Sequence, residues 1–323
     1  MLSSSININS LFNQDILYYW STPFFILVIF LEMFFSYRAR VKNYEFKDTA
    51  TNLYFALINF SLDLLMKGIS FFVLSYFYQN RIIDWEGNQY WAYWTLAFLG
   101  QDFLYYLQHY FDHSSRFFWA IHVTHHNSEY YNISTGFRSS VLQPLYRYIF
   151  FIPLAFLGIE ALHIIFAYAM IQNYGTLCHT NFINNKFSKW WGILFVTPSH
   201  HRVHHASNIK YLDKNMGMFL IIWDKIFGTF QAEEDEENYE KLKYGLTKPL
   251  EDKGPINIIF HEWKEIYNDF FHRKKHLPLR VRLKYVFMPP GWSHDGSSKT
   301  SKELQRELKN TTQEVRLEKI KVE

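Results

Sequence analysis

Two long apolar runs open the chain. The first, residues 17–37, is about as long as a helix needs to cross a bilayer, and Glu32 is its only charged residue. The second, residues 52–78, is interrupted by Asp63 and Lys67, which lie four positions apart and would face each other on one side of a helix. Both runs predict transmembrane helices.

Two further apolar segments follow. Residues 90–113 predict a third transmembrane helix. Residues 141–178 form a hydrophobic pair divided near Gly158, and each half is slightly short for an upright span. We therefore expect a helical hairpin at 141–178 that enters and leaves by the same face of the membrane.

Basic residues set the expected orientation. Arg38, Arg40 and Lys42 follow the first apolar run at once, and the positive-inside rule places that end in the cytoplasm. Counting spans from there brings the histidine-rich polar segments to the cytoplasmic face. We expect an all-α, multi-pass integral membrane bundle with a cytoplasmic helical cap over residues 109–230 that carries a histidine-rich di-metal site.

The composition changes after residue 230, where charged residues become dense. The acidic run 233–238 is typical of a solvated loop, and residues 273–284 mix bases with apolar residues as a segment on a membrane surface does. We expect one membrane-embedded domain over residues 1–297. A charged C-terminal tail, helical or frayed, should follow over residues 298–323.

Composition narrows the possible chemistry. The chain has 323 residues, of which 20% are aromatic, and its net charge of +3 comes with no basic stripe or nucleic-acid-binding motif. We therefore expect no nucleic acid partner. The single Cys178 excludes an intrachain disulfide framework and a cysteine-ligated metal cluster. Histidine is the abundant candidate ligand, with 15 residues.

Most of these histidines fall in three clusters. Spacings of three and four residues stack side chains on one face of a helix, so each cluster can present two or three imidazoles in one direction. Neutral imidazole suits iron, zinc, copper and nickel. The clusters are His109 and His113; His122, His125 and His126; and His201, His204 and His205, with His200 as a neighbour.

A metal site explains these clusters better than ordinary packing does. Nine or ten imidazoles packed together without a cation would be hard to satisfy by hydrogen bonding. A single structural zinc ion would use only four of them. Two metals with about five ligands each would use the whole set, so the ligand count predicts a di-metal site.

Two other functions remain open at this point. A membrane zinc hydrolase would need a carboxylate as general base, but no HExxH motif occurs, and Glu129 has no diagnostic spacing. A metal storage or transport protein would favour ligands along a pathway through the membrane, whereas these clusters gather at one face.

The cluster pattern HX3H, HX2HH, HX2HH at the ends of membrane helices resembles the fatty acid hydroxylase and sterol desaturase superfamily of membrane di-iron oxygenases. The resemblance covers about residues 20–295. The segments THHNSEYYNISTGFRSSVLQ (124–143), CHTNFINN (178–185), TPSHHRVHH (197–205), DKN (213–215) and LIIWDKIFGTFQAE (220–233) resemble the alkylglycerol monooxygenase branch more than the sterol or fatty acyl branches.

This resemblance implies an enzyme with two iron ions that uses O2 as co-substrate to oxidise a C–H bond of a membrane lipid. The electron donor would be a tetrahydropterin, another reductant or a protein, and the runner-up reaction is sterol or fatty acyl desaturation or hydroxylation. The implied ligands are the eight cluster histidines and His179, with His200 as a tenth ligand or close neighbour.

Three further residues are expected to support the metal centre. Asp102 lies seven positions before His109 on the same helix face, where we expect it to orient an imidazole. Asn132 and Arg138 lie in a stretch that matches the family, and their role is either in substrate binding or in structure.

The chain departs from the family pattern at two positions. Alkylglycerol monooxygenases have a glutamate directly after the second histidine of the first cluster, where this chain has Ser114. Position 175 is glycine, where other branches can offer a further histidine. The serine at position 114 weakens the expectation of a pterin donor and an ether-lipid substrate. The glycine at position 175 weakens the expectation of a tenth ligand.

Overall fold

A computed structural model describes residues 8–138, 140–183, 190–235 and 237–322. All regular elements in these ranges are helices. Two isolated β-bridges also occur, one between Phe195 and Leu220 and one between Ala206 and Tyr244. The predicted all-α class is therefore confirmed for the described residues.

Helices α1 (Ile8–Ala39) and α2 (Phe46–Gln79) contain the first two apolar runs. They are the two helices of the described chain that are long and apolar enough to cross a membrane, over Trp20–Ala39 and Phe46–Gln79. Only 17% of each window is buried inside the protein, so most of their apolar side chains face outward. Exposed apolar surfaces of this length are typical of helices that cross a membrane.

The third predicted helix is α3 (Tyr90–Ser114), which agrees with the expected 90–113 almost to the residue. The predicted hairpin reverses at Gly158, whose φ of 85° falls in the left-handed region that favours glycine. Its second arm is the single helix α7 (Ala161–Leu177).

The first arm of the hairpin is broken into short turns. Pro144 and Pro153 each lie in the first turn of a short element, where proline is tolerated, and each prevents a continuous helix through the arm. The elements are η2 (Gln143–Leu145), η3 (Arg147–Phe151) and α6 (Ile152–Phe156).

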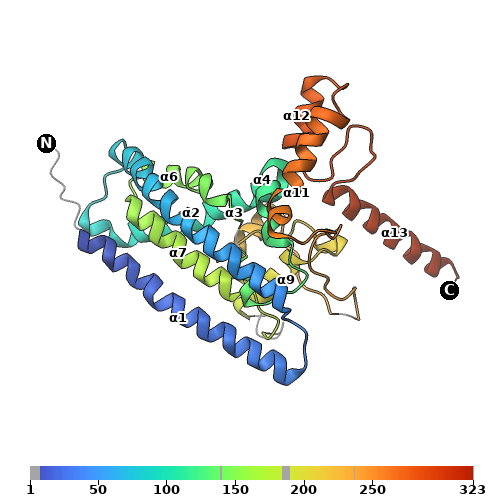
Figure 1. Ribbon diagram of the computed structural model, residues 1–323, viewed down its shortest axis with the longest axis horizontal. Coiled ribbons are helices and arrows are strands. Elements are labelled where there is room, and N and C mark those ends of the chain that lie inside the picture. Colours follow the sequence, from blue (N-terminus) through green and yellow to red (C-terminus); the bar gives the residue numbers. More distant parts are fainter. Residues whose placement is uncertain (1–7, 139, 184–189, 236, 323) are drawn as a thin grey trace.

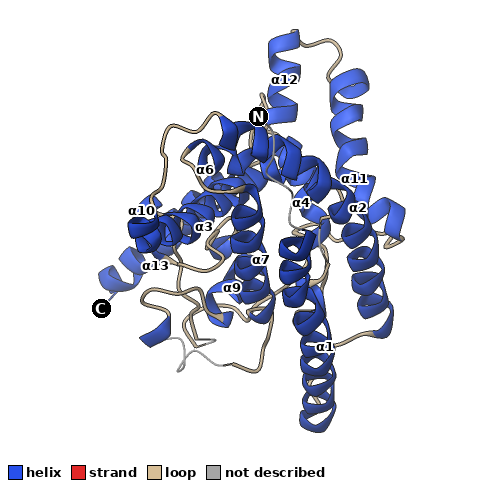
Figure 2. Cartoon of the chain, turned by 90° about the vertical axis from the view of Figure 1, so that its left-hand side faces the viewer, coloured by secondary structure: helices blue, strands red, loops and turns tan. Residues whose placement is uncertain are grey.

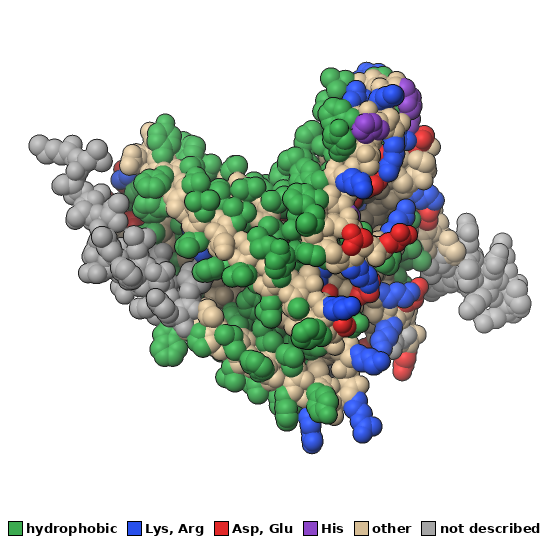
Figure 3. All heavy atoms as spheres, viewed as in Figure 1, with side chains coloured by type: hydrophobic (Ala, Val, Ile, Leu, Met, Phe, Trp, Pro, Cys, Tyr) green, Lys and Arg blue, Asp and Glu red, His purple; other side chains and the backbone are tan. Residues whose placement is uncertain are grey.

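Figure 1 shows α1, α2 and α7 as neighbouring rods, with the C-terminal helices at the other side of the molecule. The largest buried apolar cluster joins α2, α3, α6 and α7 through residues such as Leu74, Tyr105, Leu154 and Ile164. Figure 3 shows hydrophobic side chains spread over the part that contains α1 and α2, while most charged side chains lie toward the C-terminal helices.

The remaining helices lie beyond the ends of α3 and α7. Figures 1 and 2 both place α9 beside the C-terminal end of α7. The bounds are α4 (Arg116–His126), α5 (Ile133–Gly136), α9 (Pro198–His205), η4 (Ile209–Tyr211), α10 (Ile222–Phe227), α11 (Pro255–Asn268), η5 (Asp269–Arg273), α12 (Leu279–Phe287) and α13 (Ser301–Val322).

Ion pairs tie these helices together. Arg116 at the start of α4 donates to Glu262 of α11 at 2.6 Å and to Asp269 of η5 at 2.7 Å. The expectation of a solvated acidic run is wrong for its first residue: Glu233 pairs with Arg202 of α9 at 2.7 Å, and both side chains are largely buried. A buried guanidinium requires such a counter-charge.

Candidate metal centre

The chain bends sharply at two points that bring the histidine clusters together. Ser115 has extended backbone and separates α3 from α4, so the first two clusters lie on adjoining helices. Thr197 caps α9 by accepting a hydrogen bond from the backbone N–H of His200, and Pro198 follows at the first helical position. The third cluster therefore occupies a short helix from its start.

Nine imidazoles converge into two groups in which the candidate ligand nitrogens lie within 4.8 Å of one another. All nine side chains are at least nine-tenths buried. The first group contains His109, His113, His122, His126 and His204. The second contains His125, His179, His201 and His205.

Helices α4 and α9 each contribute to both groups. In α4, His122 and His126 belong to the first group, and His125 belongs to the second. In α9, His201 and His205 lie four positions apart and belong to the second group. His204 of the same helix belongs to the first group. The two candidate metal sites are thus joined through two helices, so they form one structural unit.

The second group has the donor set of a cation site. The Nδ1 atoms of His125 and His179 lie 3.0 and 2.9 Å from the carbonyl oxygens of Arg138 and Gly175, so each Nδ1 carries the hydrogen. The Nε2 atoms of the two rings then present lone pairs to each other across 3.5 Å. A cation between them removes this repulsion, so these residues fit a metal ion.

The first group has the same arrangement. Nδ1 of His109 lies 2.8 Å from the carbonyl oxygen of Met216, and Nδ1 of His204 lies 2.9 Å from that of Lys214. The buried Nε2 atoms of His113 and His204 have no hydrogen-bond partner among the described residues. Buried nitrogens without partners are costly, and a metal ion would satisfy both.

One turn supplies several of the contacts that orient these rings. Asp213 and Asn215 have positive φ values of 51° and 56°, a conformation that aspartate and asparagine tolerate better than most residues. This backbone directs the carbonyls of Lys214 and Met216 at two imidazoles, while Oδ1 of Asp213 lies 3.0 Å from Nδ1 of His113.

Sequence reasoning did not assign a role to Asp213 or to Asp112. The Asp112 carboxylate is completely buried, accepts hydrogen bonds from Gln143 and Tyr146, and lies 3.9 Å from Nδ1 of His122. For Asp213, the one feature of the sequence that could have suggested a role was its place in the DKN segment. For Asp112, it was the position of the carboxylate directly before His113.

Burial keeps these histidines neutral and therefore available as ligands. Removal from water, which disfavours the charged ring, lowers the pKa of His125 to about 4 and that of His179 to about 3. Desolvation likewise holds the pKa of His122, His126 and His205 well below the usual value, with neighbouring imidazoles adding to the effect.

The prediction that Asp102 orients an imidazole is wrong. Its carboxylate accepts hydrogen bonds from the backbone N–H groups of Phe219 and Leu220, both at 3.1 Å, and from Nε1 of Trp223 at 2.8 Å. A spacing of seven does share a helix face with His109, but two turns also separate the residues by about 10 Å along the axis. Asp102 instead anchors the segment that follows Met216.

His200 lies outside both groups, so the structure disfavours a tenth ligand and leaves the alternative expectation, a close neighbour of the ligands. Its ring packs edge-on against Phe230, with the centroids 5.4 Å apart. Successive residues of a helix point about 100° apart, so when His201 faces the second group its neighbour turns away.

Arg138 and Asn132 have structural contacts. The Arg138 guanidinium donates to the carbonyl of Thr124 and to side chains of Asp48, Asn52 and Asn127, while its own carbonyl is bonded to His125. Asn132 caps α5 and donates to the carbonyl of Asn43 at 2.7 Å. Arg138 therefore supports a candidate ligand, and Asn132 joins α5 to the connection between α1 and α2.

Position 175 has no room for the additional histidine of other branches. A Cβ atom at Gly175 would lie 1.7 Å from Sδ of Met218. The methionine occupies the place that a side chain would need, while the Gly175 carbonyl holds His179.

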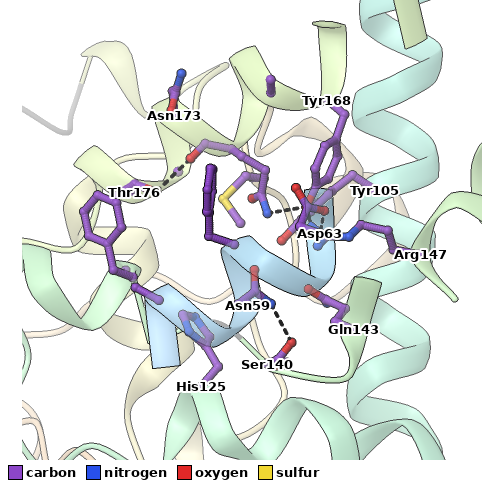
Figure 4. Close-up of a pocket in the computed structure, with 18 of the residues that line it drawn as sticks. Asn59, Asp63, Tyr105, His125, Ser140, Gln143, Arg147, Tyr168, Asn173 and Thr176 are labelled. Carbon is purple, nitrogen blue, oxygen red and sulfur yellow. Dashed lines mark hydrogen bonds and ion pairs between the residues drawn. The ribbon is translucent and has the colours of Figure 1, made fainter. Parts of the chain in front are cut away.

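A cavity adjoins the metal centre (Figure 4). It encloses about 1040 Å³, counting its open mouth, and His122, His125 and His179 contribute to its wall. Helix α2 provides a stripe of the wall at helical spacing, and α7 lies opposite.

Comparison with known proteins agrees with this site. Residues 94–229, which contain every candidate ligand, match the fatty acid hydroxylase family. The chain is 36% identical over 297 residues to the alkylglycerol monooxygenase of Homo sapiens, which covers 90% of this chain and 63% of that protein. It is 34% identical over 276 residues to the alkylglycerol monooxygenase of Xenopus tropicalis, covering 84% of this chain and 58% of that protein.

A more distant relative has a different lipid in its name. The chain is 28% identical over 190 residues to ornithine lipid hydroxylase OlsE of Rhizobium tropici, covering 54% of this chain and 56% of that protein. No solved structure gives a significant match. The chain thus spans about three fifths of the length of these three relatives.

Proposed function

We propose that this chain is a member of the fatty acid hydroxylase family and acts as a membrane-bound lipid monooxygenase that uses O2 to oxidise a C–H bond. The observation that carries the proposal is the convergence of nine buried imidazoles on two adjacent groups at the wall of a cavity between apolar helices. An arrangement rich in nitrogen and free of thiolates suits iron.

We assign two iron ions to the two groups. His109, His113, His122, His126 and His204 would hold one ion, and His125, His179, His201 and His205 the other. When bound, such a pair supplies the activation of O2. The protein keeps the rings neutral by burial and fixes their orientation through the carbonyls of Arg138, Gly175, Lys214 and Met216.

The names of the most similar relatives favour an alkylglycerol as substrate. Oxidation of the carbon next to the ether oxygen would give a hemiacetal, which collapses to a fatty aldehyde and glycerol. One oxygen atom of O2 enters the lipid, and the other leaves as water after two electrons and two protons arrive from a donor. The donor is a tetrahydropterin or another reductant, including a redox protein.

Contacts of α1 support a cytoplasmic metal centre. Glu32 accepts hydrogen bonds from the backbone N–H of Ile133 at 2.8 Å and from Oγ1 of Thr180 at 2.6 Å, next to His179. The same end of α1 leads into Arg38, Arg40 and Lys42. If that basic end lies in the cytoplasm, the histidine groups lie there too.

This orientation gives a multi-pass protein with α1 and α2 as its clearest spans. The membrane-embedded domain would cover residues 1–297, and α13 would form the charged tail over 298–323. With the metal centre at the membrane boundary, a lipid could enter the cavity from the side and place the carbon that is oxidised beside the ions.

The test is turnover by the purified protein in lipid nanodiscs, supplied with iron, O2, a reductant and an alkylglycerol. Formation of fatty aldehyde, with isotopic oxygen from O2 recovered in the product or in water, would support ether cleavage. Oxygen-dependent hydroxylation of another lipid, such as an ornithine lipid, would retain the monooxygenase and discard the ether substrate. Product formation without O2 would indicate a hydrolase, and stable metal without turnover a binding protein.

A further inference from the structure

The cavity beside the metal centre has a charged region that the proposed oxidation does not use. Asp63 and Lys67 of α2 contact each other at 2.8 Å, as their spacing predicted. The second carboxylate oxygen of Asp63 accepts a hydrogen bond from Nη2 of Arg147 at 2.8 Å. All three residues line the cavity. Figure 4 shows Asp63, Arg147 and Tyr168 gathered on one side of it and His125 on another.

The rise of helix α2 gives the distance between the metal centre and the charged region of the cavity. Asn59 donates to the carbonyl of Ser140 at 3.0 Å, and Oγ of Ser140 lies 3.4 Å from Nδ1 of His122. Asn59 is therefore level with the metal centre. At 1.5 Å per residue, Asp63 and Lys67 lie roughly 6 and 12 Å farther along the helix.

Unused hydrogen-bonding capacity points to a ligand. Arg147 is 3% exposed, and its Nε–H has no partner among the described residues although Nη1 and Nη2 bond to Tyr168 and Asp63. Tyr168 also accepts from Nε2 of Gln172 at 2.6 Å, and Gln172 lines the cavity. Buried donors are rarely left without an acceptor.

The cavity mouth shows where an alkyl chain would leave. Phe60 lines the cavity and is 55% exposed on the apolar face of α2. An apolar chain gains from contact with this face, whereas contact with Asp63 and Arg147 would desolvate charges without compensation. The polar part of a lipid therefore belongs inside, and the chain toward the mouth.

We propose that Asp63, Arg147 and Gln172 bind the uncharged, hydroxyl-bearing head group of the lipid substrate and thereby present the adjoining carbon to the histidine groups. A hydroxyl both donates and accepts, which matches the Asp63 carboxylate and the Nε–H of Arg147. The spacing along α2 suits a head group of a few heavy atoms, such as glycerol. This inference rests on the proposed lipid oxidation.

The same contacts disfavour an anionic head group. Both cations of the region already contact Asp63 at 2.8 Å, so a phosphate would have to displace that carboxylate or approach it. Like charges at such short range in a poorly solvated cavity repel strongly. A neutral polyol needs no such rearrangement.

Binding without oxygen tests the head-group site separately from turnover. The iron-loaded protein in nanodiscs would be titrated under anaerobic conditions with radiolabelled hexadecylglycerol, with its dimethyl ether, in which both hydroxyls are methylated, and with its phosphate monoester. We expect the diol to bind at least about tenfold more tightly than either analogue, because a site built for hydroxyls rejects molecules that lack them.

Asp63→Asn should reduce the preference for the diol over the dimethyl ether at least about tenfold. Arg147→Lys, which keeps the charge but removes the Nε–H, should reduce it as well and serves if the first variant does not fold. Asp84→Asn is the matched control, because the Asp84 side chain is 81% exposed and its carboxylate pairs with Arg81 at the surface, away from the cavity wall.

Equal binding of all three lipids to the wild type, tighter binding of the phosphate, or an unchanged preference in both variants would overturn the inference. If the diol preference depends on Asp63 but no oxygen-dependent product forms, the head-group site stands and the proposed monooxygenase fails.

Discussion

Oδ1 of Asp213 lies 3.0 Å from Nδ1 of His113, although the two residues are 100 positions apart. This carboxylate fixes the ring so that its Nε2 faces the first histidine group. A carboxylate behind a ligand imidazole also increases the basicity of the ring. Asp213 therefore has the orienting role that the sequence pattern predicted for Asp102.

Asp213→Asn should lower the affinity of the first site for iron by about tenfold, at the lower end of the range for such partners. Asparagine tolerates the positive φ at this position, so the substitution removes the charge and leaves the turn intact. Metal affinity would be measured by competition with a chelator. Glu251→Gln, at an exposed carboxylate, is the control; equal affinity in the two variants would contradict the role of Asp213.

Because α4 and α9 each supply histidines to both groups, a second prediction follows. His125→Ala should empty the second site, and His204→Ala the first, so each variant should hold at most about one iron and lose turnover because a ligand is removed outright. Iron would be counted per protein by elemental mass spectrometry. His276→Ala, an exposed histidine outside both groups, should retain iron and activity. Full iron in either ligand variant would mean that the clusters have a structural role.

The spacing within the second and third clusters could have predicted that their histidines divide between two groups. Residues four apart on a helix share a face, so His122 with His126 and His201 with His205 form natural pairs, while a residue one position before the second member points elsewhere. What the sequence could not provide is the position of α9 relative to α4, which depends on the turns at Ser115 and Thr197.

The contacts behind the imidazoles were largely unpredictable for another reason. Every residue has a backbone carbonyl, so nothing in the sequence distinguishes those of Gly175, Lys214 and Met216. By contrast, apolar runs predicted α3 and the C-terminal ends of α1 and α2 to within two residues. The starts of α1 and α2 lie nine and six residues before the predicted ones, because a helix can continue into polar sequence beyond its apolar run. The break in the arm before Gly158 was not predicted, although Pro144 and Pro153 disfavour a continuous helix there.

Protonation should destabilise the metal-free protein. Burial lowers the pKa of His125 to about 4 and of His179 to about 3, from 6.5 in the unfolded chain. Between these values the unfolded chain binds more protons, so stability is fully present above about pH 6.5 and is lost as the pH falls. Thermal unfolding of iron-stripped protein in detergent should therefore begin at a lower temperature at pH 5.5 than at pH 7.5. An identical midpoint at both would show that the rings are not buried neutral.

The close contact of Gly175 with Met218 gives a fourth prediction. Gly175→Ala should destabilise the protein by about 1–3 kcal/mol, the usual cost of overpacking, and weaken iron binding at the second site because the carbonyl that holds His179 shifts. Adding Met218→Ala should restore part of both losses by making room. Denaturant unfolding and iron content would measure them; a neutral Gly175→Ala would show that Met218 can move aside freely.

The last prediction concerns the electron donor. Ser114 is the final residue of α3 and directly follows His113, at the position where alkylglycerol monooxygenases carry glutamate. A carboxylate is a charge-assisted acceptor for the N–H groups of a reduced pterin, and a hydroxyl is a weaker one. Ser114→Glu should therefore lower the KM for tetrahydropterin by about tenfold, the effect of one charge-assisted hydrogen bond, while the KM for the lipid stays unchanged.

Turnover would be followed with pterin concentration varied at saturating lipid and oxygen. Ser114→Gln is the matched control, since it has the same length without the charge. If glutamate and glutamine behave alike, the pterin does not bind beside the end of α3. If neither variant responds to pterin while a reduced redox protein drives turnover, the electrons arrive from a protein partner.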